Sequence, residues 1–360
     1  MMSVRPVLIM AGGTGGHVFP ALAVADVLRQ QGVPVVWLGT RRGIEARLVP
    51  EAGYPVEWIK VRQVRGKSLM TRLLSPFNIL YACLQSLKVL FRIKPCAVLG
   101  MGGFASGPGG LVAWLLRKPL LIHEQNAVPG MTNRLLVRIA RKVMVAFPHA
   151  FDSETTHVGN PVRQSILNLP APEERFRDRD ESMRILVVGG SLGAAHLNRV
   201  VPQAVSMMTG DQRPQIIHQT GNTNLDECIA EYQRADVEAD VRAFIEDMGQ
   251  AYAWADLVIC RSGAMTVFEL AAAGVGSVLV PYPHAVDDHQ SVNAAYLQDA
   301  GAAIRVAQQE LDAERLNGLL ERMQDDRGQL LEMARRAREL AMPSSADDVA
   351  RACMQLGGIA

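Results

Sequence analysis

The stretch that decides the fold reads LVICRSGAMTVFELAAA and runs from residue 257 to residue 273. Its first four residues are apolar and predict a buried parallel strand, which breaks at Gly263. A helix is predicted over 264–273, and it ends at Gly274. In such a strand–turn–helix unit, the free amides of the first helical turn and the positive end of the helix dipole converge on one point. The stretch therefore predicts an anion site at the start of the helix.

Glu269 lies three residues after Thr266, close to this predicted anion site. A carboxylate there is a poor phosphate ligand, but it can accept hydrogen bonds from the two hydroxyls of a ribose. A second apolar run, 278–281, leads into a polar loop over 284–290 at the same edge of the sheet. These features favour a nucleotide site, whereas one such unit alone can equally be an ordinary turn followed by a solvated helix.

The composition is that of a globular protein with a sizeable core. The chain has 360 residues, of which 49% are hydrophobic and 20% charged. Its five cysteines are widely separated, which argues against a disulfide framework and a zinc site and favours a reducing compartment. No stretch has the features of a signal peptide or of a membrane span. The sequence therefore predicts a cytoplasmic protein with no metal and no other cofactor.

The net charge of +1 conceals an asymmetry between the two halves of the chain. Residues 1–162 carry 19 Lys and Arg against 7 Asp and Glu, a formal charge of +12. The remaining residues carry 18 basic and 29 acidic side chains, a formal charge of −11. A basic half joined to an acidic half indicates that the two halves bind different partners.

A strand, a glycine-rich turn and a helix occur in this order in both halves. Apolar residues 7–11 precede the turn Gly12–His17, and apolar residues 185–188 precede the turn Gly189–Gly193. The simplest interpretation is an α/β protein of two Rossmann-like domains with parallel sheets. The two helices are predicted to end near Gln31 and Met208, and further strands are predicted at 34–38, 96–100, 119–122, 142–146, 215–218, 241–244, 277–281 and 303–306.

The predicted domain boundary lies near the segment Gly159–Arg163, which gives domains of 1–162 and 163–342. The segment 169–181 is rich in prolines and charged residues and predicts a linker and surface loop. A last helix is predicted after Pro343, and its sequence allows it to pack on either domain.

Two common nucleotide motifs are incomplete. A dinucleotide site needs a carboxylate at the end of the second strand, where this chain has Arg41 and Arg42. The segment Gly66-Lys67-Ser68 lacks the first glycine of a phosphate-binding loop, because Val61 stands there. NAD binding and ATP hydrolysis are therefore disfavoured, while an NADP-dependent oxidoreductase stays open as an alternative.

Eight motifs occur in order along nearly the whole chain. They are Gly12–His17, Gly102–Pro108, His123–Asn126, Gly159–Arg163, Gly189–Gly193, Phe244–Met248, Arg261–Gly274 and Asp288–Asn293. Together they resemble the motifs of the MurG family of glycosyltransferases. The resemblance implies the GT-B fold class, in which two Rossmann-like domains face a cleft, with helix 343–360 packed back on the first domain. It also implies an inverting transfer of N-acetylglucosamine from UDP-N-acetylglucosamine to the C4 hydroxyl of lipid-linked muramyl pentapeptide (lipid I), which gives lipid II in cell-wall synthesis.

The resemblance further implies which residues bind the two substrates. Glu269 is expected at the ribose, the backbone of Ile245 at the uracil, and Ser191 with the start of helix 264–273 at the donor diphosphate. The full donor set is Thr14, Gly15, Gly16, Asn126, Arg163, Ser191, Ile245, Ala264, Met265, Thr266, Val267, Phe268, Glu269 and Gln290. The set expected at the acceptor diphosphate is Gly13, Gly103, Phe104, Ala105 and Ser106.

His17 is the preferred candidate for the base that removes the proton of the acceptor hydroxyl. It lies where the first glycine-rich turn enters its helix, and the ordinary histidine pKa of about 6.5 suits proton removal near neutral pH. Glu124 is the alternative base. A helix N-terminus and Ser191 can stabilise the leaving diphosphate, so that no metal is required.

The segment 73–91 predicts a helix with an apolar stripe that packs on the sheet. Leu74, Ile79 and Tyr81 lie off this stripe, and Trp114 lies in a similar mixture of apolar and basic residues. In a half of charge +12, these four side chains predict a membrane face that binds an anionic membrane surface peripherally. The resemblance to the MurG family implies that this surface is the cytoplasmic face of the inner membrane. The stripe consists of Leu73, Phe77, Leu80, Leu84, Leu87 and Phe91.

Three alternative functions stay open on the sequence. They are a UDP-sugar epimerase of the same architecture, an NADP-dependent oxidoreductase, and a scaffold that binds a nucleotide sugar without catalysis. The expected partners are UDP-N-acetylglucosamine, the lipid-linked acceptor, the membrane surface and other cell-wall synthesis proteins, with no nucleic acid among them.

Overall fold

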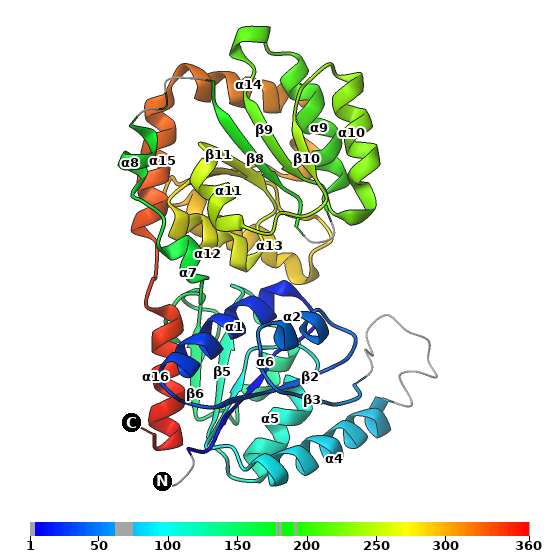
Figure 1. Cartoon of the computed structure of the whole chain (residues 1–360), viewed down its shortest axis with the longest axis vertical. Coiled ribbons are helices and arrows are strands. Elements are labelled where there is room, and N and C mark those ends of the chain that lie inside the picture. Colours follow the sequence, from blue (N-terminus) through cyan, green and yellow to red (C-terminus); the bar gives the residue numbers. More distant parts are fainter. Residues whose placement is uncertain (1–3, 62–74, 178, 180–181, 191–192, 360) are drawn as a thin grey trace. The chain divides into compact units, whose positions relative to one another are not determined.

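The computed structural model describes residues 4–61, 75–177, 179, 182–190 and 193–359. The chain forms two compact units, Met1–Arg163 with Met342–Ala360, and Gln164–Ala341 (Figure 1). We call them the first and the second domain. The division falls one residue after the boundary that the sequence predicts. The last helix, α16 (Ser345–Gly357), packs on α1 (Gly15–Gln30) and β4 (Ala97–Gly100) of the first domain.

The first domain is built on a seven-stranded sheet of order β3-β2-β1-β4-β5-β6-β7, in which all neighbouring strands are parallel. Its strands are β1 (Val7–Met10), β2 (Val35–Gly39), β3 (Val56–Trp58), β4, β5 (Leu120–Glu124), β6 (Lys142–Val145) and β7 (Thr156–His157). Its other helices are α2 (Glu45–Glu51), α4 (Ser75–Ile93), α5 (Ser106–Leu115) and α6 (Met131–Leu136).

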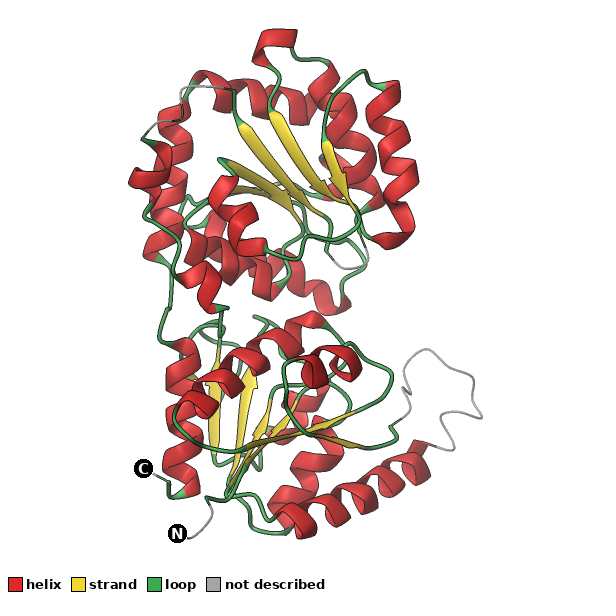
Figure 2. Ribbon diagram, viewed as in Figure 1, coloured by secondary structure: helices red, strands yellow, loops and turns green. Residues whose placement is uncertain are grey.

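Helices cover both faces of this sheet (Figure 2). Successive side chains of β1 alternate between the two faces, as the period of a strand requires. Val7 and Ile9 pack in the core under α1 and α16, whereas Leu8 and Met10 pack in the core under α4 and α5. Because both faces are buried, the strands read as continuous apolar runs, which is why the sequence predicted most of them. The short strands β3 and β7 were not predicted.

The second domain has a six-stranded parallel sheet of order β10-β9-β8-β11-β12-β13. Its strands are β8 (Arg184–Val188), β9 (Gln215–Gln219), β10 (Asp240–Arg242), β11 (Leu257–Cys260), β12 (Gly276–Leu279) and β13 (Ala303–Arg305). Its helices are α7 (Gln164–Leu167), α8 (Pro172–Phe176), α9 (Ala195–Ser206), α10 (Leu225–Arg234), α11 (Met248–Trp254), α12 (Ala264–Ala273), α13 (His289–Gln298), α14 (Ala313–Asp325) and α15 (Arg327–Glu339).

The predicted packing face of α4 is wrong. Phe77, Leu80, Leu84 and Phe91 were expected to lie on the sheet, but they are 71%, 58%, 56% and 59% exposed. The helix instead buries a different face, formed by Ala82, Ser86, Val89 and Leu90, with Cys83 and Ile93 partly buried beside it. Leu87 of the predicted stripe is also partly buried against the core, as expected. An apolar stripe fixes the period of a helix but not which face meets the core, and α4 is apolar on both faces. Leu73 lies outside the described residues.

The segment 169–181, predicted as a linker, contains α8 and a buried arginine that the sequence did not reveal. The guanidinium of Arg175 donates hydrogen bonds to the carbonyls of Tyr252, Ala273 and Gly274, near the C-terminal ends of α11 and α12. Burial, followed by the neighbouring Arg179 and Arg338, lowers the pKa of Arg175 to about 10, so the side chain stays cationic at neutral pH. A cation at the C-terminal end of a helix is favoured by the helix dipole.

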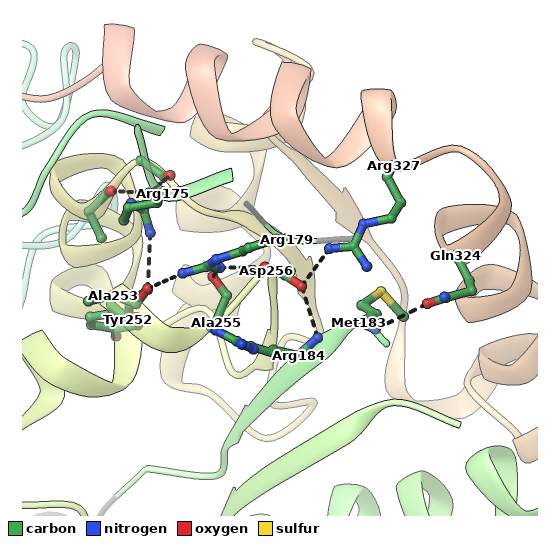
Figure 3. A network of polar contacts seen from close by, with 12 residues as sticks. Arg175, Arg179, Met183, Arg184, Tyr252, Ala253, Ala255, Asp256, Gln324 and Arg327 are labelled. Atoms are coloured by element: carbon green, nitrogen blue, oxygen red, sulfur yellow. Dashed lines mark hydrogen bonds and ion pairs between the residues drawn. The ribbon is translucent and has the colours of Figure 1, made fainter. Parts of the chain in front are cut away.

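Asp256 is the acidic centre of the same region (Figure 3). The residue is fully buried, and its carboxylate forms ion pairs with Arg179 and Arg327. It also accepts a hydrogen bond from the amide of Arg184, at 3.0 Å, where β8 begins. Through one carboxylate, the network therefore joins the segment after α8, the first residue of β8 and the first residue of α15.

Replacing Asp256 by alanine is expected to lower the free energy of unfolding of the second domain by about 3–5 kcal/mol, because two partly buried guanidinium groups lose their counter-charge. The matched control is Asp240→Ala, which breaks an exposed ion pair with Arg242 and is expected to cost about 1 kcal/mol or less. Calorimetric unfolding of the full-length variants measures both. Equal losses in the two variants would contradict a structural role for the buried network.

Candidate active site

In each domain, two glycine-containing turns lie at the point where the strand order reverses. In the first domain β1 and β4 are neighbours, and in the second domain β8 and β11 are neighbours. In open parallel sheets, ligands bind at the carboxyl ends of the strands at this switch point. The turns Gly12–His17, Gly102–Pro108, Gly189–Gly193 and Arg261–Ala264 all follow these four strands directly.

The two turns of the first domain touch each other. A Cβ atom added to Gly103 would lie 2.3 Å from the carbonyl oxygen of Gly12, and one added to Gly102 would lie 2.8 Å from the ring of His17. Gly102 and Gly103 also have positive φ angles of +94° and +85°, which side chains rarely adopt. Only glycine therefore allows this close approach, which brings His17 against the second turn.

A buried carboxylate that the sequence analysis missed supports the first turn. Glu45 is fully buried, and its Oε2 accepts a hydrogen bond from the amide of Gly13 at 2.9 Å. Its Oε1 accepts from the amide and the hydroxyl of Thr40 at 3.1 and 2.7 Å. The amide of Gly13 is thus already paired, and it is not available to the diphosphate that the sequence assigned to it. The first-turn amides of α1, at Gly15 and Gly16, have no acceptor within the helix.

The second turn corrects two predicted acceptor contacts. Ala105 and Ser106 are fully buried, so neither can touch a diphosphate in this conformation. The hydroxyl of Ser106 lies 2.8 Å from the carbonyl of Met10 and 2.7 Å from that of Gly102, and it therefore ties β1 to the turn. Gly103 is partly exposed and Phe104 is 46% exposed, and both remain candidates.

His17 and Glu124 differ in how their polar atoms are used. The ring Nδ1 of His17 lies 2.9 Å from Oε1 of Gln125. Glu124 is 1% exposed, and each of its oxygens accepts hydrogen bonds: Oε1 from Asn126 (3.0 Å from its amide) and Oε2 from Gly130 and Asn133 (3.1 and 2.8 Å). Such a carboxylate shapes the loop after β5 and is poorly placed to take a proton from a substrate.

Two predicted donor contacts of the first domain have internal partners. Asn126 points its side-chain amide at Glu124, with Nδ2 3.3 Å from Oε1. The guanidinium of Arg163 lies over the ring of Phe19, 5.1 Å from its centroid, which is a cation–π arrangement. Together with Thr14, Gly15 and Gly16, these residues stay predictions as donor contacts.

In the second domain, Gly193 packs tightly where the turn after β8 ends. Gly193 has a φ angle of +76°, and a Cβ atom there would lie 2.0 Å from the carbonyl oxygen of Thr220, at the end of β9. Ser191, the expected diphosphate contact in this turn, lies outside the described residues. Its role stays a prediction.

The turn after β11 leads into α12 as the sequence predicts, with the helix over Ala264–Ala273 and Gly274 in the left-handed conformation after it. The first-turn amides, at Ala264, Met265 and Thr266, have no acceptor within the helix. Val267 was expected to contact the donor, and this expectation is corrected. The residue is fully buried, and its amide already donates to the carbonyl of Gly263 at 3.0 Å.

Glu269 and Phe268 lie on α12, about one turn after its first-turn amides. Glu269 is 7% exposed, and its Oε2 accepts a hydrogen bond from the hydroxyl of Tyr252 at 3.2 Å. Phe268 is only 2% exposed and stacks on Tyr296, with 5.3 Å between ring centroids, so its side chain supports the helix. A donor contact from this residue stays a prediction.

The remaining two donor candidates have oriented polar groups. The amide of Ile245 donates to Oε1 of Gln219 at 3.1 Å, so its carbonyl is the group left for a base. Oε1 of Gln290 accepts a hydrogen bond from the amide of Tyr282 at 2.9 Å. The Nε2 donor of the same side-chain amide therefore points away from Tyr282. Among the described residues, no group of three His, Cys, Asp or Glu side chains could hold a metal ion.

The predicted residues thus form two groups, one at the switch point of each domain. The first contains His17, Gly103 and Phe104 with the start of α1, and the second contains Glu269 with the start of α12. Glu45, Gln125 and Tyr252 belong to these sites but were missed. Each of the three forms a hydrogen bond with a predicted residue that is distant in the sequence, and no local sequence signal marks such pairs.

Comparison with known proteins identifies the family. Residues 7–145 match the Glycosyltransferase family 28 N-terminal domain, and residues 184–349 match the Glycosyltransferase family 28 C-terminal domain. A relative from Nitrosococcus oceani is named UDP-N-acetylglucosamine--N-acetylmuramyl-(pentapeptide) pyrophosphoryl-undecaprenol N-acetylglucosamine transferase. It is 52% identical over 357 residues, 99% of both chains. A relative of the same name from Alkalilimnicola ehrlichii is 54% identical over 97% of this chain and 98% of its own.

Solved structures agree with this result. The chain is similar to the crystal structure of MurG from Acinetobacter baumannii, with a TM-score of 0.84 and 42% identity over 98% of this chain and 99% of that one. A UDP-GlcNAc 2-epimerase from Neisseria meningitidis, with a TM-score of 0.68 and 11% identity over 97% of this chain and 100% of that one, shares the fold alone. The chain therefore belongs to the MurG family, within glycosyltransferase family 28, and has the GT-B fold of two Rossmann-like α/β domains.

Proposed function

We propose that this chain transfers N-acetylglucosamine from UDP-N-acetylglucosamine to the C4 hydroxyl of lipid-linked muramyl pentapeptide. The proposal rests on the relatives from Nitrosococcus oceani and Alkalilimnicola ehrlichii, whose shared name states this activity. They are 52% and 54% identical to this chain, and the matches cover nearly the full length of both partners. The two sites support it, because the second domain offers a helix N-terminus beside a buried carboxylate and the first offers a histidine beside two glycine-rich turns.

Transfer of radiolabel tests the function directly. UDP-[14C]-N-acetylglucosamine is incubated with the chain, with and without the lipid-linked acceptor. We expect labelled lipid only when the acceptor is present. Turnover of the donor without any acceptor would instead support an epimerase or a hydrolase, and binding without turnover would support a scaffold.

The donor site is assigned to the second domain. The amides of Ala264, Met265 and Thr266, with the dipole of α12, are suited to the diphosphate. One turn further along the helix, the carboxylate of Glu269 is suited to the two ribose hydroxyls. The carbonyl of Ile245 can accept from N3 of the uracil, and Gln290 offers its Nε2 to the sugar.

The reaction is an inverting displacement in which His17 serves as the base. The C4 oxygen of the acceptor forms a bond to C1 of the sugar while the bond from C1 to the diphosphate oxygen breaks. The electron pair leaves with UDP, and the proton of the hydroxyl passes to the imidazole of His17. Glu124 is a weaker candidate, since its oxygens are occupied within the protein. The start of α12 stabilises the charge that develops on the leaving diphosphate.

We assign membrane binding to the exposed apolar face of α4 and α5, adjacent helices of the first domain (Figure 1). Among the described residues, no helix is both long and apolar enough to cross a bilayer. Ile79, Tyr81 and Trp114 are 47%, 53% and 47% exposed, while Leu74 lies outside the described residues. The stripe that we expected in the core, Phe77, Leu80, Leu84 and Phe91, adds to this face. Large exposed apolar surfaces rimmed by polar residues are typical of such interfaces.

Replacing Glu269 by alanine is expected to weaken UDP binding and to raise the donor KM by about 10- to 150-fold. The reason is the loss of charge-assisted hydrogen bonds worth roughly 1.5–3 kcal/mol. Titration calorimetry with UDP measures the effect, and Glu321→Ala, an exposed glutamate on α14, is the control. UDP affinity equal to that of the parent chain would remove the ribose assignment.

Replacing His17 by alanine is expected to lower kcat by about two to four orders of magnitude, as for the loss of a general base, with UDP affinity nearly unchanged. Steady-state kinetics with a soluble acceptor analogue separate kcat from KM. A change confined to KM would show that His17 binds substrate and does not take the proton.

The double variant Ile79→Ser/Trp114→Ser is expected to bind anionic vesicles about tenfold or more weakly, since partial withdrawal of each side chain from water contributes roughly 1 kcal/mol. Turnover of the natural lipid acceptor should fall too, whereas turnover of a water-soluble analogue should not. Met207→Ser is the control, because Met207 is 49% exposed on the second domain. Equal losses with both acceptors would indicate damage to the fold and contradict the membrane assignment.

A further inference from the structure

Four polar groups of the first domain form a chain that ends at His17. Nε2 of His123 lies 2.9 Å from the carbonyl oxygen of Gly159, and Nδ1 of the same ring lies 3.0 Å from Nε2 of Gln125. Oε1 of Gln125 lies 2.9 Å from Nδ1 of His17. Among the described residues, Nε2 of His17 has no hydrogen-bond partner.

The chemistry of these groups gives the chain one direction. A carbonyl oxygen only accepts, so Nε2 of His123 must carry the hydrogen that it donates to Gly159. Burial lowers the pKa of His123 to about 4, which keeps its ring neutral and leaves Nδ1 as an acceptor. The amide nitrogen of Gln125 therefore faces His123, and its oxygen faces His17.

A second acceptor fixes the same orientation of Gln125. Its Nε2 also donates to the backbone carbonyl of His123 at 3.1 Å, so a flipped side chain would place two oxygens against each other. Both His123 and Gln125 are fully buried, and the backbone around them is pinned by Asn133 and Asn160. The hydroxyl of Ser345, at the start of α16, donates to the same carbonyl of Gly159 at 2.9 Å and anchors the far end of the chain.

We infer that His123 and Gln125 are positioning residues that hold His17 as the tautomer protonated on Nδ1, with the lone pair of Nε2 left to take the proton of the acceptor hydroxyl. The inference rests on the proposed role of His17 as base. A histidine protonated on Nε2 could not accept a proton there, and the wrong tautomer disables a catalytic histidine even where the geometry is intact.

The tautomer can be measured directly in the full-length chain. The protein is labelled with 15N-histidine, and the two-bond correlations between ring protons and ring nitrogens are recorded at a pH where His17 is neutral. The signals of His17 are those absent from the spectrum of His17→Ala. We expect the hydrogen on Nδ1. A hydrogen on Nε2 would overturn the inference.

Two variants of Gln125 then connect the tautomer to catalysis. Gln125→Met has a similar length but lacks both the amide oxygen that accepts from His17 and the amide nitrogen that donates to His123, and its thioether is only a weak acceptor. We expect its kcat to fall by about 10- to 1000-fold, with the donor KM within about twofold of the parent value. Gln125→Glu keeps an acceptor toward Nδ1 of His17, and as a neutral carboxyl group it can also donate to His123 in place of the amide nitrogen. We expect it to recover part of this loss. Thermal unfolding of both variants establishes that the first domain, which contains Gln125, is folded.

The outcomes separate this inference from the proposed function. A Gln125→Met variant with the kcat of the parent chain, alongside a strongly impaired His17→Ala, would overturn the positioning role and leave the base intact. An unchanged kcat in His17→Ala would overturn the base, and the inference with it. Loss of activity in Gln125→Met with recovery in Gln125→Glu, and Nδ1 protonation of His17 in the parent chain, supports both.

Discussion

The parallel arrangement of the strands is the constraint on which both sites depend. All strands of a domain point their carboxyl ends to one edge of its sheet, and the strand order reverses between β1 and β4 and between β8 and β11. At these two points the connecting helices leave on opposite faces, so the turns are open to a ligand. Close turns then require glycine, as at Gly103 and Gly193, and helix N-termini supply amides for phosphate groups. The chemistry is added to this frame by a few side chains.

These side chains depend on buried polar partners from distant parts of the chain. Glu45 satisfies the amide of Gly13, Tyr252 donates to Glu269, and Gln125 orients His17. On the far side of the second domain, Arg175 and Asp256 stabilise the opposite ends of the elements that carry the donor site. Buried polar groups without partners are costly, and such networks therefore hold a loop in one conformation.

Sequence reasoning predicted the sheets well, because strands buried on both faces are continuous apolar runs with glycine turns after them. It predicted α12 correctly over 264–273, with Gly274 as the residue that ends the helix. It failed for the packing face of α4, since an apolar stripe has the same period whether it meets a core or lies exposed. It also assigned ligand contacts to Ala105, Ser106 and Val267, which are buried. Motifs mark a site, but they do not tell which of their residues face it.

The central claim is that the second domain binds UDP through the start of α12 and Glu269. Hydrogen–deuterium exchange of the full chain with and without UDP tests this claim most directly. The account predicts that UDP slows exchange at the amides of 263–266 and in the segment around Ile245. Protection confined to the turns of the first domain, with none at the start of α12, would contradict it.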